Sequence, residues 1–155
     1  MPLHVAVQTA PFDVGVQTAR LSALSPLTGG IGLFVGQVRG GDRLVAMTLE
    51  HYPGMTEGIL HALAQEAQAR FDLTGCTVIH RVGRLEVGAG IVFVGASASH
   101  RAAALQATTF LIDRLKTGAP FWKREEYANG QAQWVDARET DEEAARAWLQ
   151  QSPVP

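Results

Sequence analysis

The stretch MTEGILHALAQEAQARF, residues Met55 to Phe71, carries the clearest structural signal in this 155-residue sequence. Its larger apolar residues recur three and four positions apart, which places them on one face of an α-helix. The residues on that face are Ile59, Leu60, Leu63, Ala67 and Phe71. The pattern predicts an amphipathic helix over residues 55–71 that packs against a core.

Strand-like segments lie on both sides of this helix. Upstream, Ile31 to Val38 and Leu44 to His51 flank the turn Arg39-Gly-Gly-Asp42, which predicts a β-hairpin with Arg39 near its tip. Downstream, Thr77 to Val82 and Gly90 to Ala96 predict two more strands, connected by residues 84–89. Strands therefore follow one another as neighbours instead of alternating strictly with helices.

The two ends of the chain extend this arrangement. Near the start, we expect a strand at Leu3 to Gln8 and a helix at Asp13 to Leu24. After the central strands, Ser99 is a suitable N-cap for a helix to about Thr117, where Gly118 and Pro120 are stop signals. The last expected elements are a hairpin of Phe121 to Glu126 and Gln133 to Ala137 around Asn129-Gly130, and a helix capped by Thr140 or Asp141 that ends at Leu149.

This order of elements favours an α+β fold with a mixed or antiparallel sheet and packed helices over a doubly wound sheet. The chain contains 46% hydrophobic and 18% charged residues, as expected for one globular domain. We therefore expect a single domain over residues 1–155, with a terminal helix and tail from about residue 139.

Composition excludes several classes of function. A formal net charge of -2 provides no basic field for long stretches of nucleic acid. The single cysteine, Cys76, allows no intrachain disulfide and no thiolate-rich metal site, and we expect it to be a small buried side chain. Neither a secretory signal nor a membrane-spanning stretch is evident, so a soluble cytoplasmic protein is expected.

Local motifs exclude further chemistry. The sequence Gly88-Ala-Gly90 leads into a strand, unlike a dinucleotide-binding loop, and there is no Walker phosphate loop, so no nucleotide cofactor is expected. The five histidines lack metal-protease spacing, and His51 and His80 fall in strands, where a packed imidazole is commoner than a ligand. We predict no catalytic metal. The sequence Ser97-Ala-Ser99-His100 also lacks the glycines of a nucleophile elbow.

The lysines are the most informative residues. Of 13 basic residues only Lys116 and Lys123 are lysines, and they lie seven positions apart around Gly-Ala-Pro-Phe-Trp. A desolvated amine can lose its proton and act in catalysis, whereas a guanidinium cannot, so this clustering indicates a chemical role. The alternative is a solvated helix end, where a cation suits the helix dipole.

A second group of residues is suited to an anion. Ser99, His100 and Arg101 open a predicted helix, whose free amides and positive dipole end favour a phosphate or carboxylate. Arg39 on its turn could likewise hold a phosphate. In both places ordinary solvent-exposed side chains remain an alternative from the residues alone.

Four strings of residues resemble the large subunit family of molybdopterin synthases. They are Phe34-Val-Gly-Gln-Val-Arg39, Leu49-Glu-His-Tyr-Pro-Gly-Met-Thr-Glu57, Val78-Ile-His-Arg-Val-Gly83 and Leu115-Lys-Thr-Gly-Ala-Pro-Phe-Trp-Lys-Arg-Glu125. Their order and spacing also fit, and the resemblance extends from the first strand to the segment Trp134-Val-Asp-Ala-Arg138.

The resemblance implies an α/β hammerhead fold and an enzyme of molybdenum cofactor biosynthesis. Two sulfurs would pass, one carrier at a time, from the C-terminal Gly-Gly thiocarboxylate of a small ubiquitin-like subunit to cyclic pyranopterin monophosphate, which becomes molybdopterin. It also implies a homodimer of this chain with a small subunit at each end, a heterotetramer overall.

The family's site residues correspond to positions in this sequence. Lys116 and Lys123 match its catalytic lysines, and the His100-Arg101 pair matches a pterin site expected across the dimer interface. Gln37, Val38 and Arg39 match another substrate-binding stretch, and Arg124 and Glu125 extend the region of Lys123. The chain departs from the family in the short turn Arg39 to Arg43 and in Gly118, which is often Arg; these could alter substrate closure and carrier docking.

Two other functions remain open from the sequence. One is a non-catalytic subunit that docks a ubiquitin-like carrier, which would need no pterin site. The other is a phosphate-binding pterin or nucleotide enzyme that works alone, which leaves the paired lysines and the Pro-Phe-Trp segment unexplained.

Overall fold

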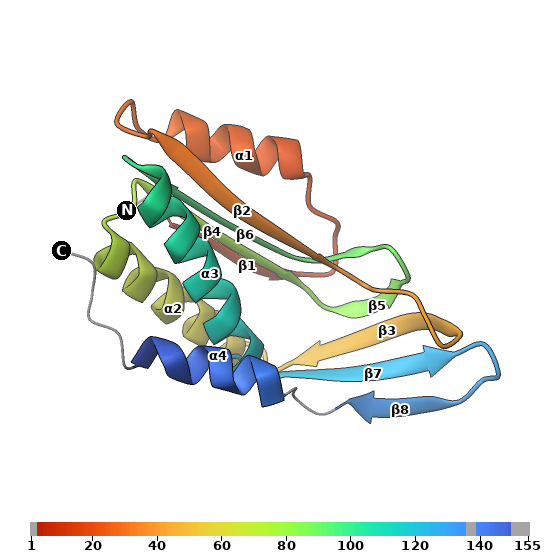
Figure 1. Ribbon diagram of the computed structural model, residues 1–155. Helices are drawn as coiled ribbons and strands as arrows, with labels where there is room; N and C mark the ends of the chain where they lie inside the picture. Colours follow the sequence, from red (N-terminus) through yellow and green to blue (C-terminus); the bar gives the residue numbers. More distant parts are fainter. Residues whose placement is uncertain (1–2, 136–138, 150–155) are drawn as a thin grey trace.

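The computed structural model describes residues 3–135 and 139–149, and within them the strands form two four-stranded sheets (Figure 1). The larger sheet has the order β1 (Leu3–Gln8), β4 (Gly75–Arg81), β6 (Gly90–Ala98), β2 (Gly30–Gln37); only β1 and β4 run parallel. The smaller sheet is antiparallel, with the order β5 (Gly83–Glu86), β3 (Leu44–His51), β7 (Phe121–Tyr127), β8 (Ala132–Val135).

Helices cover both faces of the larger sheet. The helix α1 (Val14–Ala23) lies on one face, and α2 (Met55–Phe71) and α3 (Arg101–Gly118) lie on the other (Figure 1). A fourth helix, α4 (Glu139–Leu149), packs against α3. The α+β class with a mixed sheet is confirmed. Within the described ranges, no helix is both long enough and apolar enough to cross a membrane.

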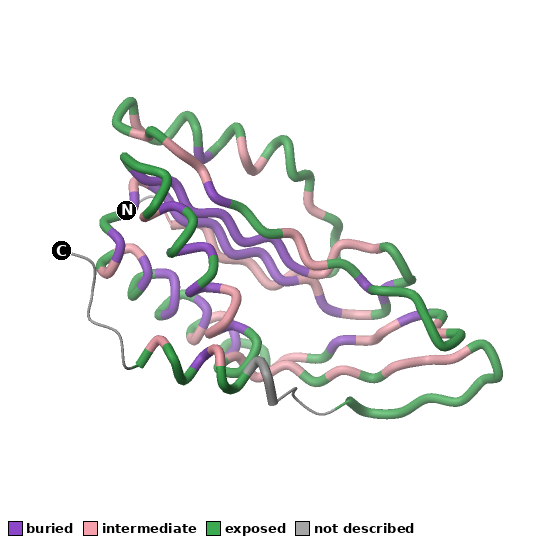
Figure 2. Tube along the Cα trace, in the orientation of Figure 1, coloured by how far each residue is buried: buried purple, intermediate pink, exposed green. Residues whose placement is uncertain are grey.

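Alternating side chains on the central strands build the core on both faces. On β6, Phe93 packs with Leu21 and Ile79 under α1, whereas Val92 and Val94 pack under α2 and α3. Figure 2 shows that buried residues follow these central strands, whereas β8 is exposed throughout. Cys76 is buried, as predicted, among the residues that pack under α2 and α3. This burial raises the pKa of its thiol to about 12, so the thiol stays protonated.

The predicted hairpin of residues 31–51 is wrong, because its two strands belong to different sheets. Strand β2 pairs with β6, while β3 lies between β5 and β7. Beyond β2, the buried side chain of Val38 packs against Leu49 of the smaller sheet. Gly41, Asp42 and Arg43 all have positive φ angles and redirect the chain. The partners of β3 come later in the sequence, so a local turn pattern could not identify them.

Three smaller expectations also need correction. Residues 83–86 form β5 and are more than a connection. The N-cap of α3 is His100 instead of Ser99, and α4 begins at Glu139, so Thr140 and Asp141 belong to the helix instead of capping it. The late hairpin and the end of α4 at Leu149 are confirmed, although Ala137 lies outside the described residues.

Candidate active site around the two lysines

The structure brings Lys116 and Lys123 together at the junction of the two sheets. Lys116 is exposed in the last turn of α3. Lys123 is half-buried on β7, where it pairs with Leu49 of β3 and Val135 of β8. Both amines act electrostatically on the same buried imidazole, that of His80 on β4. The two lysines therefore border one site.

His80 lies beneath this site as a neutral group. Its side chain is 4% exposed, and its Nδ1 lies 2.8 Å from the carbonyl oxygen of Arg81, so Nδ1 carries the proton that is donated. Burial, followed by electrostatic interactions with Lys123, Lys116 and His51, lowers its pKa to about 4, although the bond to Arg81 opposes this shift. The predicted packed histidine is confirmed here.

This buried imidazole should make the protein acid-sensitive. Between pH 6.5 and 4 the unfolded chain protonates His80 and the native chain does not, so the free energy of unfolding should fall as the pH falls through that window. The full contribution is roughly 3 kcal/mol. Urea unfolding at several pH values should show a shallower decline for His80→Gln than for the wild type. His61→Gln, at an exposed histidine of α2, is the control; parallel declines for the wild type and His80→Gln would refute the assignment.

The alternation of β7 divides the residues around Lys123 between two faces. Glu125 shares the face of Lys123, is half-buried and accepts a hydrogen bond from the hydroxyl of Tyr127. Arg124 is exposed on the opposite face, together with Trp122. Of Arg124 and Glu125, Glu125 is therefore the residue whose side chain lies on the same face as Lys123.

The stretch from Gln37 to Arg39 crosses between the sheets. Gln37 is exposed at the end of β2, next to a bulge, and Arg39 is exposed on the following loop. The side chain of Val38 is 2% exposed in the small core, and its amide donates to the carbonyl of Ala89. Val38 holds the crossing in place, while Gln37 and Arg39 present side chains that a ligand could reach.

His100 and Arg101 lie at the opposite end of α3 from Lys116. Both are exposed, and the side chain of His100 makes no capping hydrogen bond to the first-turn amides. Arg101 and Lys116 are fifteen positions apart on this helix, or about 22 Å along the axis. One chain therefore presents two separate groups: a pair of lysines at one end of α3 and an anion-suited helix start at the other.

A glycine that sequence reasoning missed as part of the site fixes this helix start. A Cβ at Gly29 would lie 2.0 Å from the carbonyl oxygen of Ser99, so any larger residue would push β2 away from the start of α3. The amide of Gly29 donates to the carbonyl of Ala98 at 2.8 Å. In the sequence, the pair Gly29-Gly30 is no more than a turn signal.

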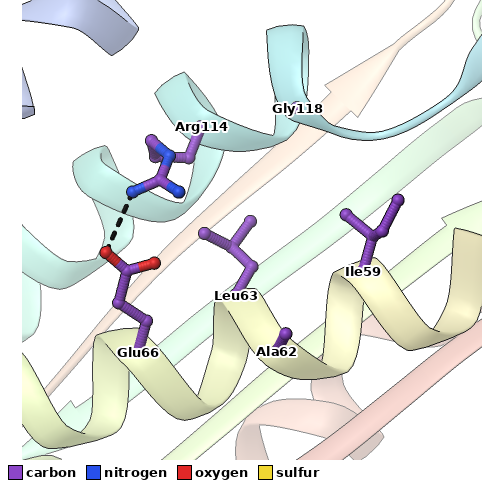
Figure 3. Close-up of a pocket in the computed structure, with 6 residues that line it drawn as sticks. All are labelled: Ile59, Ala62, Leu63, Glu66, Arg114 and Gly118. Atoms are coloured by element: carbon purple, nitrogen blue, oxygen red, sulfur yellow. Dashed lines mark hydrogen bonds and ion pairs between the residues drawn. The ribbon is translucent and has the colours of Figure 1, made fainter.

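A shallow hollow of about 200 Å³ lies between α2 and the end of α3 (Figure 3). Arg114 of α3 and Glu66 of α2 bridge its side with a 3.0 Å ion pair, and Gly118 lies at its rim. Neither lysine lines it. Within the described side chains, no three His, Cys, Asp or Glu residues are placed to hold a metal ion.

Comparisons with known proteins place this geometry in a family. The family model described as MoaE protein matches residues 7–118, more than half of the chain. The chain belongs to the MoaE family. The molybdopterin synthase catalytic subunit of Salmonella typhimurium is 46% identical over 148 residues, which cover 94% of this chain and 97% of the relative.

Solved structures agree with the MoaE assignment. The molybdopterin biosynthesis MoaE protein of Burkholderia ambifaria is 44% identical, with a TM-score of 0.82 over 96% of this chain and 99% of the other. A chain from the Helicobacter pylori complex of subunits 1 and 2 of molybdopterin-converting factor has a TM-score of 0.69 at 19% identity, over 90% of this chain and 92% of that one. At that identity the likeness shows the fold.

Proposed function

We propose that this chain is the catalytic subunit of a cytoplasmic molybdopterin synthase. It would transfer sulfur from the C-terminal thiocarboxylate of a small ubiquitin-like carrier to cyclic pyranopterin monophosphate. The observation that carries the proposal is that the only two lysines of the sequence lie on either side of one short connection and both act electrostatically on the same buried imidazole. The 46% identity to a relative named molybdopterin synthase catalytic subunit, over nearly the whole chain, supports it.

The residues around the lysines suit this chemistry. A thiocarboxylate is an anion, and an ammonium group is a compact partner for it. A lysine can also donate its proton to an oxygen that leaves when sulfur adds, which a guanidinium cannot do. Because His80 is neutral, it adds no third positive charge beside the two amines.

The pterin phosphate would bind at the start of α3 of a second copy of this chain. Within one copy, Arg101 and Lys116 lie too far apart to contact one small substrate. Strand β2 is an edge of the larger sheet, and it exposes Leu33 and Phe34, while Leu105 is exposed on the neighbouring α3. These apolar residues suit contact between two copies. With one carrier at each lysine site, the assembly would be a heterotetramer.

Arg101→Ala should weaken pterin binding more than carrier binding. Loss of one charge-assisted contact to a phosphate costs about 1.5–3 kcal/mol, or roughly 10- to 150-fold in Kd. Calorimetric titration of the wild type and the variant with cyclic pyranopterin monophosphate, and separately with the carrier, measures both effects. Arg20→Ala, at an exposed arginine of α1, is the control. Equal pterin affinity in wild type and Arg101→Ala would reject this role.

Reconstitution tests the function itself. The purified chain is mixed with thiocarboxylated carrier and cyclic pyranopterin monophosphate, and mass spectrometry follows the dithiolene product and the loss of thiocarboxylate. Product that requires the carrier supports the synthase. Tight carrier binding without product would indicate a docking subunit, and turnover without a carrier would indicate an enzyme that works alone.

A further inference from the structure

The segment that joins the two lysines is short and begins at an exposed helix end. Residues 119 and 120 connect the end of α3 to the start of β7, and a Cβ added at Gly118 would meet no neighbouring atom within 4 Å. The amide of Phe121 donates to the carbonyl of Ala119 in a tight turn. Without further support, such a connection would let the two amines change their separation.

A buried hydroxyl holds this segment from the side of α2. Thr56, in the first turn of α2, is 0% exposed, and its Oγ1 donates to the carbonyl oxygen of Pro120 at 3.3 Å. The same oxygen accepts from the amide of Tyr52 at 3.0 Å. Because a threonine hydroxyl has a single hydrogen, the bond from Tyr52 leaves that hydrogen for Pro120.

A stacked pair of rings holds the segment from the side of the larger sheet. The ring of Phe121 lies parallel to the imidazole of His80, with centroids 3.7 Å apart and planes at 16°. The bond from His80 to the carbonyl of Arg81 fixes the rotation of that imidazole. On the smaller sheet, Phe121 pairs with His51, so its position depends on both sheets.

We infer that Thr56 and His80 are positioning residues that set the separation of the Lys116 and Lys123 amines. Each contacts the connection between the lysines, at Pro120 and at Phe121 respectively. The importance of that separation for catalysis rests on the proposed function. The separation itself is a property of the chain alone and can be measured without carrier or pterin.

The scarcity of lysine provides a direct measurement. Lys116 and Lys123 are the only lysines in 155 residues. A series of amine-reactive cross-linkers of increasing length can therefore join these two side chains. Peptide mass mapping separates this product from links to the N-terminal amine. The wild type should show a sharp optimum of yield at one length. Thr56→Val and His80→Leu should broaden that optimum, while Thr56→Ser should restore it.

Turnover supplies the second readout. If the reaction needs a fixed spacing, Thr56→Val and His80→Leu should lower kcat by roughly 10- to 100-fold with little change in KM for the carrier. Thr109→Val removes another threonine hydroxyl, one that is exposed on α3 and bonds only within its helix, and should leave the length profile and turnover unchanged.

The outcomes separate the two proposals. Folded Thr56→Val and His80→Leu proteins with the wild-type length profile would overturn the positioning role, whatever their activity. If His80→Leu does not fold, the same comparison is made with His80→Gln. A wild type that shows the sharp optimum but transfers no sulfur would overturn the proposed function and leave the positioning role intact.

Discussion

Lys116→Ala should lower the rate of sulfur transfer by about 100-fold or more, the loss typical of removing a group that moves a proton in catalysis. The side chain is exposed in the last turn of α3, so its removal creates no cavity. The variant should therefore unfold at the same urea concentration as the wild type. Single-turnover assays with thiocarboxylated carrier, run beside an unfolding curve, measure both quantities.

Two further substitutions test whether the loss of turnover in Lys116→Ala is caused by the missing amine. Thr117→Ala, at the exposed neighbouring position, should retain wild-type rates. Lys116→Arg keeps the positive charge but removes the amine that can lose a proton, so it should restore carrier binding more than turnover. Near-normal turnover in folded Lys116→Ala would show that this lysine has no catalytic role.

Phe110→Ala should lower the free energy of unfolding by roughly 3–5 kcal/mol, the range for an aromatic residue removed from a core. Phe110 is 0% exposed and meets Phe71 and Trp148 edge-on, with ring centroids 5.4 and 5.5 Å away. The guanidinium groups of Arg70 and Arg114 lie over its faces at 5.2 and 5.3 Å. Its loss should weaken the packing of α2, α3 and α4 together.

Urea unfolding at a fixed protein concentration measures this loss. Val16→Ala on α1 is the control, because that side chain is exposed and lies outside the surface proposed for contact between two copies, so its truncation should cost about 1 kcal/mol or less. A loss for Phe110→Ala no larger than that for Val16→Ala would contradict the assignment of this ring to the core.

Local patterns were sufficient for most elements of this fold. The apolar spacing in Met55–Phe71 predicted α2, and Asn129-Gly130 predicted the turn between β7 and β8, because both signals depend on neighbouring residues. The hairpin around Arg39 failed because strand partners are chosen by packing. The apolar residues Ile31 and Val35 hold β2 in the layer under α1, away from β3.

The residues of the candidate site were also predicted only in part from the sequence. The lysines could be found by counting, since their residue type is rare in this chain. Thr56 gave no such signal, because a threonine near a helix start usually acts as a cap, and its bond to Pro120 spans 64 positions. The separation of Arg101 from Lys116 followed from the predicted helix length, but only the fold shows which residues surround each end.

The smaller sheet has a consequence for the order of assembly. Its strands come from three distant parts of the chain, 44–51, 83–86 and 121–135, with helices and strands of the larger sheet between them. No single cut could release it as a fragment. Pairing strands that are so far apart in the sequence costs chain entropy. This cost falls once the larger sheet has formed, because the larger sheet brings the distant segments close together. The lysine site should therefore be among the last regions to form and, over a small core, among the first to be lost when the protein is stressed.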